Sequence, residues 1–231
     1  MFLFSSSLAL LPLFLLTTAR AVSTVTLTQS AAAAATSTSE SSDYTSDTAF
    51  QKDMLDAHNF YRGEHNASTL TWNESSAAVA VKWADGCRFV HSGGPTGENL
   101  ASGYANATAS VDAWGLEREK YNWKSPGFKE ATGHFTQVVW SNTTSVGCGR
   151  TACGGKNGTP GWYVVCEYYP PGNVVGGTGG DQFFKDNVKV LSKGKATDTV
   201  ESGVSSGGGW WCREEVDGCF GGCGGGCVVV G

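Results

Sequence analysis

The octapeptide GHFTQVVW, from Gly133 to Trp140, is the most informative stretch of this 231-residue chain. Its histidine, His134, is one of two that lie in short motifs beside a carboxylate-bearing segment. The second histidine, His91, ends the motif CRFVH (87–91). The carboxylates lie in the segments GENLA (97–101) and WGLEREKY (114–121). Two imidazole nitrogens can bind a divalent ion such as Zn²⁺ while carboxylates orient the imidazoles or the bound waters. Alone this indication is weak, because a histidine is more often a hydrogen-bonded structural residue than a ligand.

Composition narrows the class of protein. Hydrophobic residues make up 40% of the chain and aromatic residues 11%, so a core can be buried and a wholly disordered protein is excluded. The net charge is −5, with no long basic run, which argues against nucleic-acid binding. Eight cysteines and five N-x-[ST] sequons point away from the cytosol.

The amino-terminal part predicts secretion. The apolar run 8–16 is too short to span a bilayer and precedes Ala19-Arg20-Ala21, which has the form of a signal-peptidase site. We interpret residues 1–21 as a removed signal peptide, although the lack of Lys and Arg before the apolar run leaves an uncleaved anchor as the alternative. Residues 22–48 are rich in Ser, Thr and Ala and predict a flexible, O-glycosylated spacer. The expected location is extracellular, with no membrane span.

From Phe50 onwards the pattern is that of one α+β domain over residues 49–190. Apolar spacings and caps predict three helices, followed by short β-like runs. The helices are expected at Gln51–Arg62, from the Asn73 cap to Gly86, and from Thr108 to about Tyr121; the strands at Gln137–Trp140, Val146–Arg150 and Trp162–Tyr169; and residues 181–190 are expected to pack back on the domain.

Residues 191–231 form a Gly/Cys-rich tail that contains Cys212, Cys219, Cys223 and Cys227. These cysteines could form two bridges, bind metal or cross-link chains. Their spacing matches no familiar zinc module, so we expect a disordered tail.

The motifs resemble a known family. GHFTQVVW and YVVCEYYPPGNVVG (163–176) are similar to the two signature segments of the CAP superfamily, which groups cysteine-rich secretory proteins, antigen-5 and pathogenesis-related class 1 proteins. AHNFYR (57–62), LTWNESSAAVAVKWADGC (70–87), GENLA and WGLEREKY extend the resemblance over about residues 50–190. The run 121–140 resembles most the fungal Pry-type, sterol-exporting branch.

The resemblance implies an α-β-α sandwich with a central cavity lined by His91, Glu98, Glu117 and His134. In family members the two histidines can hold Zn²⁺ or Mg²⁺, with the carboxylates in support. Glu119 competes with Glu117, but the spacing W-x-x-E-x-x-x-Y selects Glu117. We find no Ser or Cys nucleophile paired with these histidines. The other residues considered receive supporting roles: Asn99 and Gln137 hydrogen-bond to the cavity, His58 is structural, and His65 is solvated.

A separate lipid site is implied by Tyr121, Trp123 and Phe128. Their spacing resembles the caveolin-binding-type motif of sterol-binding CAP proteins. Rings around the turn Ser125-Pro126-Gly127 could clasp a rigid sterol and exclude water. The alternative is that Tyr121 and Trp123 simply pack into the core.

Cys87, Cys148, Cys153 and Cys166 allow three pairings, among which the sequence alone does not choose. The family pattern implies Cys87–Cys153 and Cys148–Cys166. The sequons predict N-glycans at Asn66, Asn73, Asn106 and Asn142, whereas Asn157 is disfavoured by the nearby Pro160.

The function expected from these observations is that of a secreted, non-enzymatic CAP protein that binds sterols and related lipids, fatty acids among them, for solubilisation or export. Two alternatives remain open. One is a metal-dependent hydrolase or protease that uses the two histidines and two glutamates. The other is a defence or virulence factor that acts through a surface partner.

Overall fold

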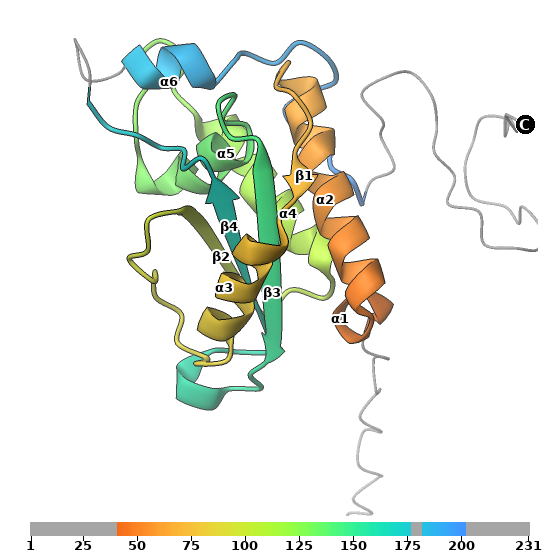
Figure 1. Cartoon of the computed structure of the whole chain (residues 1–231). Helices are drawn as coiled ribbons and strands as arrows, with labels where there is room; N and C mark the ends of the chain where they lie inside the picture. Colours follow the sequence, from red (N-terminus) through yellow and green to blue (C-terminus); the bar gives the residue numbers. More distant parts are fainter. Residues whose placement is uncertain (1–40, 177–181, 202–231) are drawn as a thin grey trace, which may run out of the picture. The chain divides into compact units, whose positions relative to one another are not determined.

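The computed structural model describes residues 41–176 and 182–201, which form an α+β domain built on a mixed four-stranded sheet (Figure 1). The strand order is β1-β3-β4-β2. Strand β1 runs parallel to β3, while β4 is antiparallel to both β3 and β2. The strands are β1 (Thr71–Trp72), β2 (Gly97–Ser102), β3 (Ser145–Ala152) and β4 (Trp162–Tyr169). Strand β2 therefore forms one edge of the sheet.

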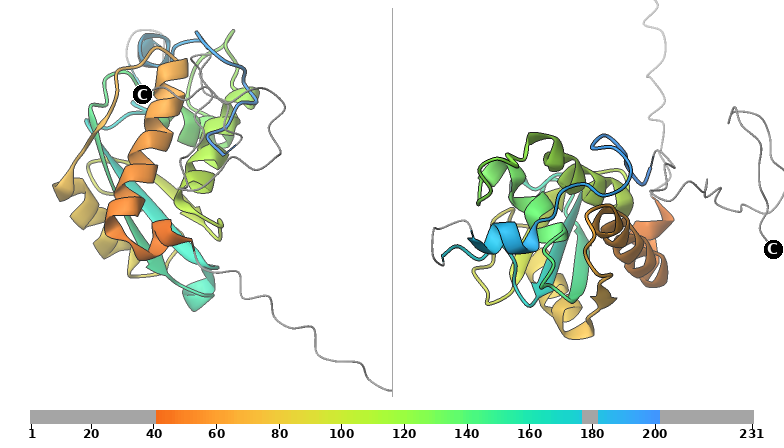
Figure 2. Two further views of the ribbon diagram at one scale, coloured as in Figure 1. Left: turned by 90° about the vertical axis from the view of Figure 1, so that its right-hand side faces the viewer. Right: turned by 90° about the horizontal axis from the view of Figure 1, so that it is seen from above.

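Helices cover both faces of this sheet (Figures 1 and 2). One face packs against α3, and the other packs against α2, α4 and α5. The described elements are α1 (Ser42–Thr45), α2 (Asp47–Glu64), α3 (Glu74–Ala84), α4 (Ala107–Gly115), η1 (Leu116–Lys120), η2 (Glu130–Thr132), α5 (Gly133–Val138), η3 (Lys156–Gly158) and α6 (Gln182–Asn187). The arrangement is the three-layer α-β-α architecture that the sequence predicts.

Two glycines on β3 let α3 approach the sheet closely. A Cβ atom on Gly147 would lie 2.2 Å from the backbone nitrogen of Ala77, and one on Gly149 would lie 2.3 Å from that of Val81. Both contacts are with helix backbone, which cannot move aside as a flexible side chain would. The alternating glycines of β3 therefore set the distance between this helix and the sheet.

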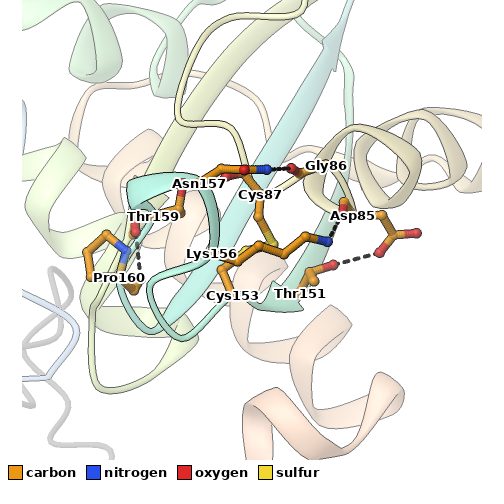
Figure 3. The surroundings of a disulfide bond; sticks show 10 residues. Asp85, Gly86, Cys87, Thr151, Cys153, Lys156, Asn157, Thr159 and Pro160 are labelled. Atoms are coloured by element: carbon orange, nitrogen blue, oxygen red, sulfur yellow. Dashed lines mark hydrogen bonds between the residues drawn. A yellow bond between two sulfur atoms is a disulfide. The ribbon is translucent and has the colours of Figure 1, made fainter.

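Both disulfides implied by the family resemblance are formed. Cys148 and Cys166 are cross-strand partners on β3 and β4, with a Cα–Cα distance of 4.1 Å. Cys87 and Cys153 join the end of α3 to the loop after β3. Around this second bond, Asn157 Nδ2 donates to the carbonyl of Gly86 at 2.9 Å (Figure 3). The loop that follows β3 is thus held to α3 by covalent and polar contacts.

The element predictions are right for α3, with Asn73 as its N-cap, and for β4. The third predicted helix ends earlier: α4 stops at Gly115 and continues as the 3-10 helix η1. The predicted strand Gln137–Trp140 is wrong, because Gln137 and Val138 are the last two residues of helix α5 and Val139 is its C-cap. Strand β2 was not anticipated from its sequence, GENLAS.

The packed domain extends beyond the predicted limits of 49–190 at both ends. Tyr44 of α1 lies in the expected spacer, yet it is buried and stacks on Trp162 at 4.9 Å between ring centroids. After α6, the buried guanidinium of Arg118 donates to the carbonyls of residues 195, 196 and 198. Residues 191–201, expected in the disordered tail, are therefore attached to the domain; we call them the C-terminal strap.

The signal peptide, residues 22–40 of the spacer and the four tail cysteines lie outside the described residues. No helix within the described ranges is long and apolar enough to cross a bilayer.

Candidate functional site at the edge of the sheet

Glu117 positions His134 through three hydrogen bonds. One carboxylate oxygen accepts from His134 Nδ1 at 2.7 Å. The other accepts from the backbone N–H groups of His134 and Phe135, at 3.0 and 3.1 Å, in the first turn of α5. A carboxylate there satisfies free N–H groups and interacts favourably with the helix dipole. Glu117 therefore both starts the helix and orients the imidazole that the helix carries.

Glu98 of β2 holds His91 in a parallel way. Its Oε1 atom accepts from His91 Nδ1 at 2.6 Å and from the backbone N–H of Ser92 at 2.9 Å. The His91 side chain is 64% exposed, whereas that of Glu98 is 6% exposed. A loop imidazole is thus fixed by a carboxylate from a regular strand.

The two His–Glu pairs flank strand β2 and do not merge into one cluster. Along a strand, alternate side chains point to opposite faces. Leu100 packs in the core on the α3 side and Ala101 in the core on the α5 side, so Glu98 has the orientation of Leu100. Glu117 and His134 come from the opposite layer. Among the residues that the structure describes, no group of three or more His, Cys, Asp or Glu side chains stands close enough to hold a metal ion.

Each pair leaves one imidazole nitrogen for other chemistry. A carboxylate only accepts hydrogen bonds when ionised, so Nδ1 of each histidine carries the proton that it shares. Nε2 is then the atom that can bind a cation or accept a proton, with the carboxylate as the orienting partner. In the described part of the chain, no hydroxyl or thiol is hydrogen-bonded to either imidazole. Each pair therefore offers one imidazole nitrogen to a divalent ion, whose other ligands would be water.

Glu167 is a buried carboxyl beside Glu98 that sequence reasoning missed. The two residues are cross-strand partners, and Glu167 is fully buried. Burial, above all, raises the pKa of Glu167 to about 7, and the neighbouring Glu98 carboxylate adds to the shift. Thr96 donates a hydrogen bond that acts in the opposite direction. The signal was present in the motif CEYYPPGN, where Glu167 follows a buried cysteine in a strand.

A cavity of about 210 Å³ adjoins the Glu117–His134 pair. Its wall is mainly apolar, with the polar pair at one place on it. The aromatic members Phe89, Tyr104 and Trp114 were not anticipated as site residues, although Phe89 lies two positions before His91 in sequence. The lining residues are Phe89, Leu100, Ala101, Ser102, Tyr104, Ala113, Trp114, Glu117 and His134.

A buried hydrogen-bond chain supports this wall from behind. Asn99 Nδ2 donates to the carbonyl of His134 and to the hydroxyl of Tyr168, both at 3.1 Å. The Tyr168 hydroxyl lies 2.7 Å from His58 Nε2, and His58 Nδ1 lies 2.6 Å from the carbonyl of Met54. Because that carbonyl only accepts, Nδ1 carries the proton and Tyr168 donates to Nε2. Burial lowers the pKa of His58 to about 4, which fits its structural role. Gln137 contributes separately, accepting from the backbone N–H of Gly172 at 3.0 Å.

The three aromatic residues of the expected lipid site have different environments. Tyr121 is buried in the core, in line with the alternative interpretation for that residue. Trp123 is 37% exposed and stacks on His65, while Phe128 is 46% exposed. None of the three lines the cavity beside His134. The loop therefore presents two partly exposed rings and no preformed clasp.

The prediction that His65 is solvated is wrong. Its side chain is buried between Trp123 and Phe135, and its Nδ1 atom lies 2.7 Å from the carbonyl of Lys189. Burial lowers the pKa of His65 to about 4. Its partners lie 58 or more positions away in sequence, so the local polar context of His65 could not reveal this packing.

Comparison with known proteins places this geometry in a family. The model of the cysteine-rich secretory protein family, CAP, matches residues 55–168. A pathogenesis-related protein of PR-1 type from Sambucus nigra is 43% identical over 137 residues, which are 54% of this chain and 78% of that protein. The chain belongs to the CAP family. Both disulfides and both His–Glu pairs described above lie within the matched residues 55–168.

Fungal relatives of this CAP domain include Protein PRY2 of Saccharomyces cerevisiae, 46% identical over 148 residues, and Secreted protein RBT4 of Candida albicans, 44% identical over 143 residues. The matches cover 62% and 59% of this chain, but only 42% and 39% of the two relatives, so the chain spans about two fifths of their length. Among solved structures, Schistosoma mansoni venom allergen-like protein 4 has a TM-score of 0.46 at 23% identity, covering 54% of this chain and 89% of that one.

Proposed function

We propose that this CAP protein is secreted and binds sterols and related lipids non-covalently, solubilising or exporting them. The single observation that carries the proposal is the pair of partly exposed rings, Trp123 and Phe128, on the loop between η1 and η2. This loop lies in the stretch whose sequence resembles the sterol-exporting fungal branch. Secretion is supported by the amino-terminal sequence and by the similarity to Secreted protein RBT4.

Phe128 is the ring with the most freedom to contact a ligand. Its edge lies over Gly133, where a Cβ atom would be 3.0 Å from Phe128 Cε2. Gly127 beside it has a φ of +155°, which a residue with a side chain rarely adopts. The absence of side chains at both glycines leaves the ring free to change its orientation when a flat apolar molecule arrives.

His91 and His134 are the proposed ligands for a divalent cation, Zn²⁺ or Mg²⁺, with Glu98 and Glu117 as their orienting partners. Bound metal would add positive charge at the polar end of the cavity beside His134. Lipid binding at the loop requires no such ion, because the loop rings and the cavity have no residue in common.

The test is binding of radiolabelled cholesterol and of a radiolabelled fatty acid to the purified, secreted full chain, with and without a chelator. We expect saturable cholesterol binding that the chelator leaves unchanged. Phe128→Ala should weaken it at least tenfold, about 1.4 kcal/mol of binding free energy.

Phe183→Ala provides the matched control, because Phe183 is similarly exposed (39%) but lies on α6, outside the loop. Equal losses in the two variants, or no cholesterol binding by the unmodified chain, would contradict the proposal. Peptidase and esterase activity that depends on metal in the same preparation would favour the hydrolase alternative.

A further inference from the structure

We propose that this protein docks on anionic lipid membranes through one surface, formed by residues 119–130 and 182–195, which we call the lysine surface. The inference goes beyond the proposed lipid binding and does not depend on it, because docking needs only the exposed side chains of these two segments.

Lysines are concentrated on this surface. Seven of the ten lysines in the chain lie in the two segments, and all seven are exposed: Lys120, Lys124, Lys129, Lys185, Lys189, Lys193 and Lys195. The acidic residues in the same segments are Glu119, Glu130 and Asp186, which leaves a net charge of +4. Since the whole chain carries −5, all other residues together carry −9. Positive charge is therefore concentrated in these two segments of the sequence.

Contacts through the end of α2 bring the two segments together. The imidazole of His65 stacks on Trp123 of the first segment and lies 2.7 Å from the carbonyl of Lys189 in the second. Arg118, one residue before the first segment, donates to the carbonyl of Lys195 at 2.9 Å. Figure 1 shows α5 and α6, which follow the first segment and begin the second, at the same end of the domain. The two segments that carry the lysines thus lie next to each other in the domain.

Exposed apolar side chains lie among these lysines. Trp123 and Phe128 are 37% and 46% exposed, and Phe183 and Val190 are 39% and 65% exposed. A bilayer surface offers both partners at once, because its headgroups attract lysines while its acyl boundary accepts aromatic and aliphatic side chains. A soluble polyanion, such as a nucleic acid or a sulfated glycan, would use the lysines and leave the apolar side chains in water.

The type of basic residue also favours a membrane. Both segments supply lysines and no arginine. Arginine forks recognise one phosphate in a fixed bidentate geometry, whereas lysine ammonium groups act as point charges with flexible stems. Such groups suit a fluid layer of headgroups, whose positions change continually.

The test uses the secreted full chain and unilamellar vesicles of phosphatidylcholine, alone or with phosphatidylserine, in a flotation assay. We expect clear binding to the phosphatidylserine vesicles and little to pure phosphatidylcholine. The triple variant Lys124→Glu, Lys129→Glu, Lys189→Glu should bind the anionic vesicles at least ~30-fold more weakly.

The matched control is the triple variant Lys52→Glu, Lys82→Glu, Lys156→Glu, which makes the same charge change at the three exposed lysines outside the lysine surface. The affinity of this control variant for the anionic vesicles should fall by less than about threefold. Phe128→Ser should also weaken vesicle binding, and its relative effect should persist in high salt, where the lysine contribution is screened.

Three results would overturn the proposal: equal binding to the two vesicle types, equal losses in the two triple variants, or binding to heparin or DNA without binding to vesicles. Cholesterol binding in vesicle-free solution separates this proposal from the preceding one. The lysine variants should retain it, so a loss of docking with retained cholesterol binding isolates the lysine surface as the cause.

Discussion

The imidazole of His65 lies nearly parallel to the indole of Trp123, with ring centroids 5.9 Å apart and planes at 12°. Tyr121 and Phe135 approach the indole edge-on, at 4.7 and 6.2 Å between centroids. Trp123 is therefore part of the packing of the domain, even though more than a third of it is exposed. Within the described ranges, Phe128, five residues later on the same loop, makes no comparable ring–ring contact.

The two rings should therefore respond differently to truncation. We expect Trp123→Ala to lower the free energy of unfolding by about 1–3 kcal/mol, since it removes a ring from an aromatic cluster. Phe128→Ala should change it by less than about 0.5 kcal/mol, as is usual for an exposed side chain. Urea denaturation of the two variants measures both values. Equal destabilisation would show that Phe128 also has a packing role and would weaken its assignment to ligand contact.

Acid should destabilise the fold through His58 and His65. Both have a pKa of about 4 in the folded protein, compared with 6.5 when unfolded, so the unfolded state binds more protons between these values. The stabilisation that comes from keeping these two imidazoles neutral is fully present above pH 6.5. As the pH falls from 6.5 towards 4, each histidine lowers the free energy of unfolding by about 1.4 kcal/mol per pH unit.

Glu167 acts with the opposite sign. Its pKa is raised to about 7, so its contribution is fully present below pH 4.5 and is lost as the pH rises through 7. Between pH 6.5 and 4.5 the stabilisation gained from Glu167 on acidification offsets about the loss caused by one of the two histidines. We therefore expect Glu167→Gln to steepen the acid loss of stability by about 1.4 kcal/mol per pH unit in this window. Denaturation series at several pH values, with a chelator present, measure the slope; an unchanged slope in the variant would contradict the assignment.

The parts of the fold that local sequence could predict are those whose determinants are local. The side chain of Asn73 accepts a hydrogen bond from the backbone N–H of Ser76, so four consecutive residues determine where α3 begins. Strand β4 has a continuous apolar run, which suits a central strand buried on both faces. The resemblance to the CAP family, and not the local sequence, implied both disulfides and the four residues of the His–Glu pairs.

Helix α5 could not be predicted locally, because distant residues satisfy both of its ends. Glu117 accepts from its first N–H groups, while Arg62 of α2 donates to the carbonyls of Val138 and Trp140, at 2.9 and 2.8 Å. Without these partners, the sequence QVVW has the β-branched residues of a strand. Phe89 and Tyr104 were missed as lining residues for a similar reason, since only the folded chain brings their loops to the cavity.

Removing Arg118 should release the C-terminal strap. The guanidinium is buried and pairs with the buried carboxylate of Glu64 while it donates to three strap carbonyls. Arg118→Ala leaves these acceptors unsatisfied and Glu64 unpaired, which should cost about 3–5 kcal/mol. Urea denaturation gives the loss, and trypsin should cut at Lys193 or Lys195 much faster than in the unmodified chain. Arg88→Ala is the control, because Arg88 is exposed; a loss as small as in that variant would contradict the role of Arg118 in holding the C-terminal strap.

The sequons should differ in how completely they are glycosylated. Asn66 and Asn142 are exposed. Asn73 and Asn106 each cap a helix with Oδ1, and their Nδ2 atoms donate to Ser145 and Glu201, at 3.3 and 2.7 Å. Because the glycan bonds to Nδ2, we expect higher occupancy at Asn66 and Asn142. Glycopeptide mass spectrometry measures this. Full occupancy at Asn106 would show that the cap forms with the glycan in place.

The arrangement of the two His–Glu pairs around edge strand β2 leads to a test of how a metal ion is held. If one ion is shared by the Nε2 atoms of His91 and His134, either single change to Ala should lower metal binding nearly as much as both changes together. Both side chains are partly exposed, 64% and 33%, so truncation opens no core cavity and the variants should remain folded. Because the two pairs flank β2 and form no single cluster, we expect each single variant to lose only the Zn²⁺ held at its own pair and the double variant to lose both, by calorimetry and elemental analysis. Complete loss of Zn²⁺ in either single variant would instead show that one ion is shared. Undiminished binding in the double variant would place the ion elsewhere, with Cys212, Cys219, Cys223 and Cys227 as the first residues to replace.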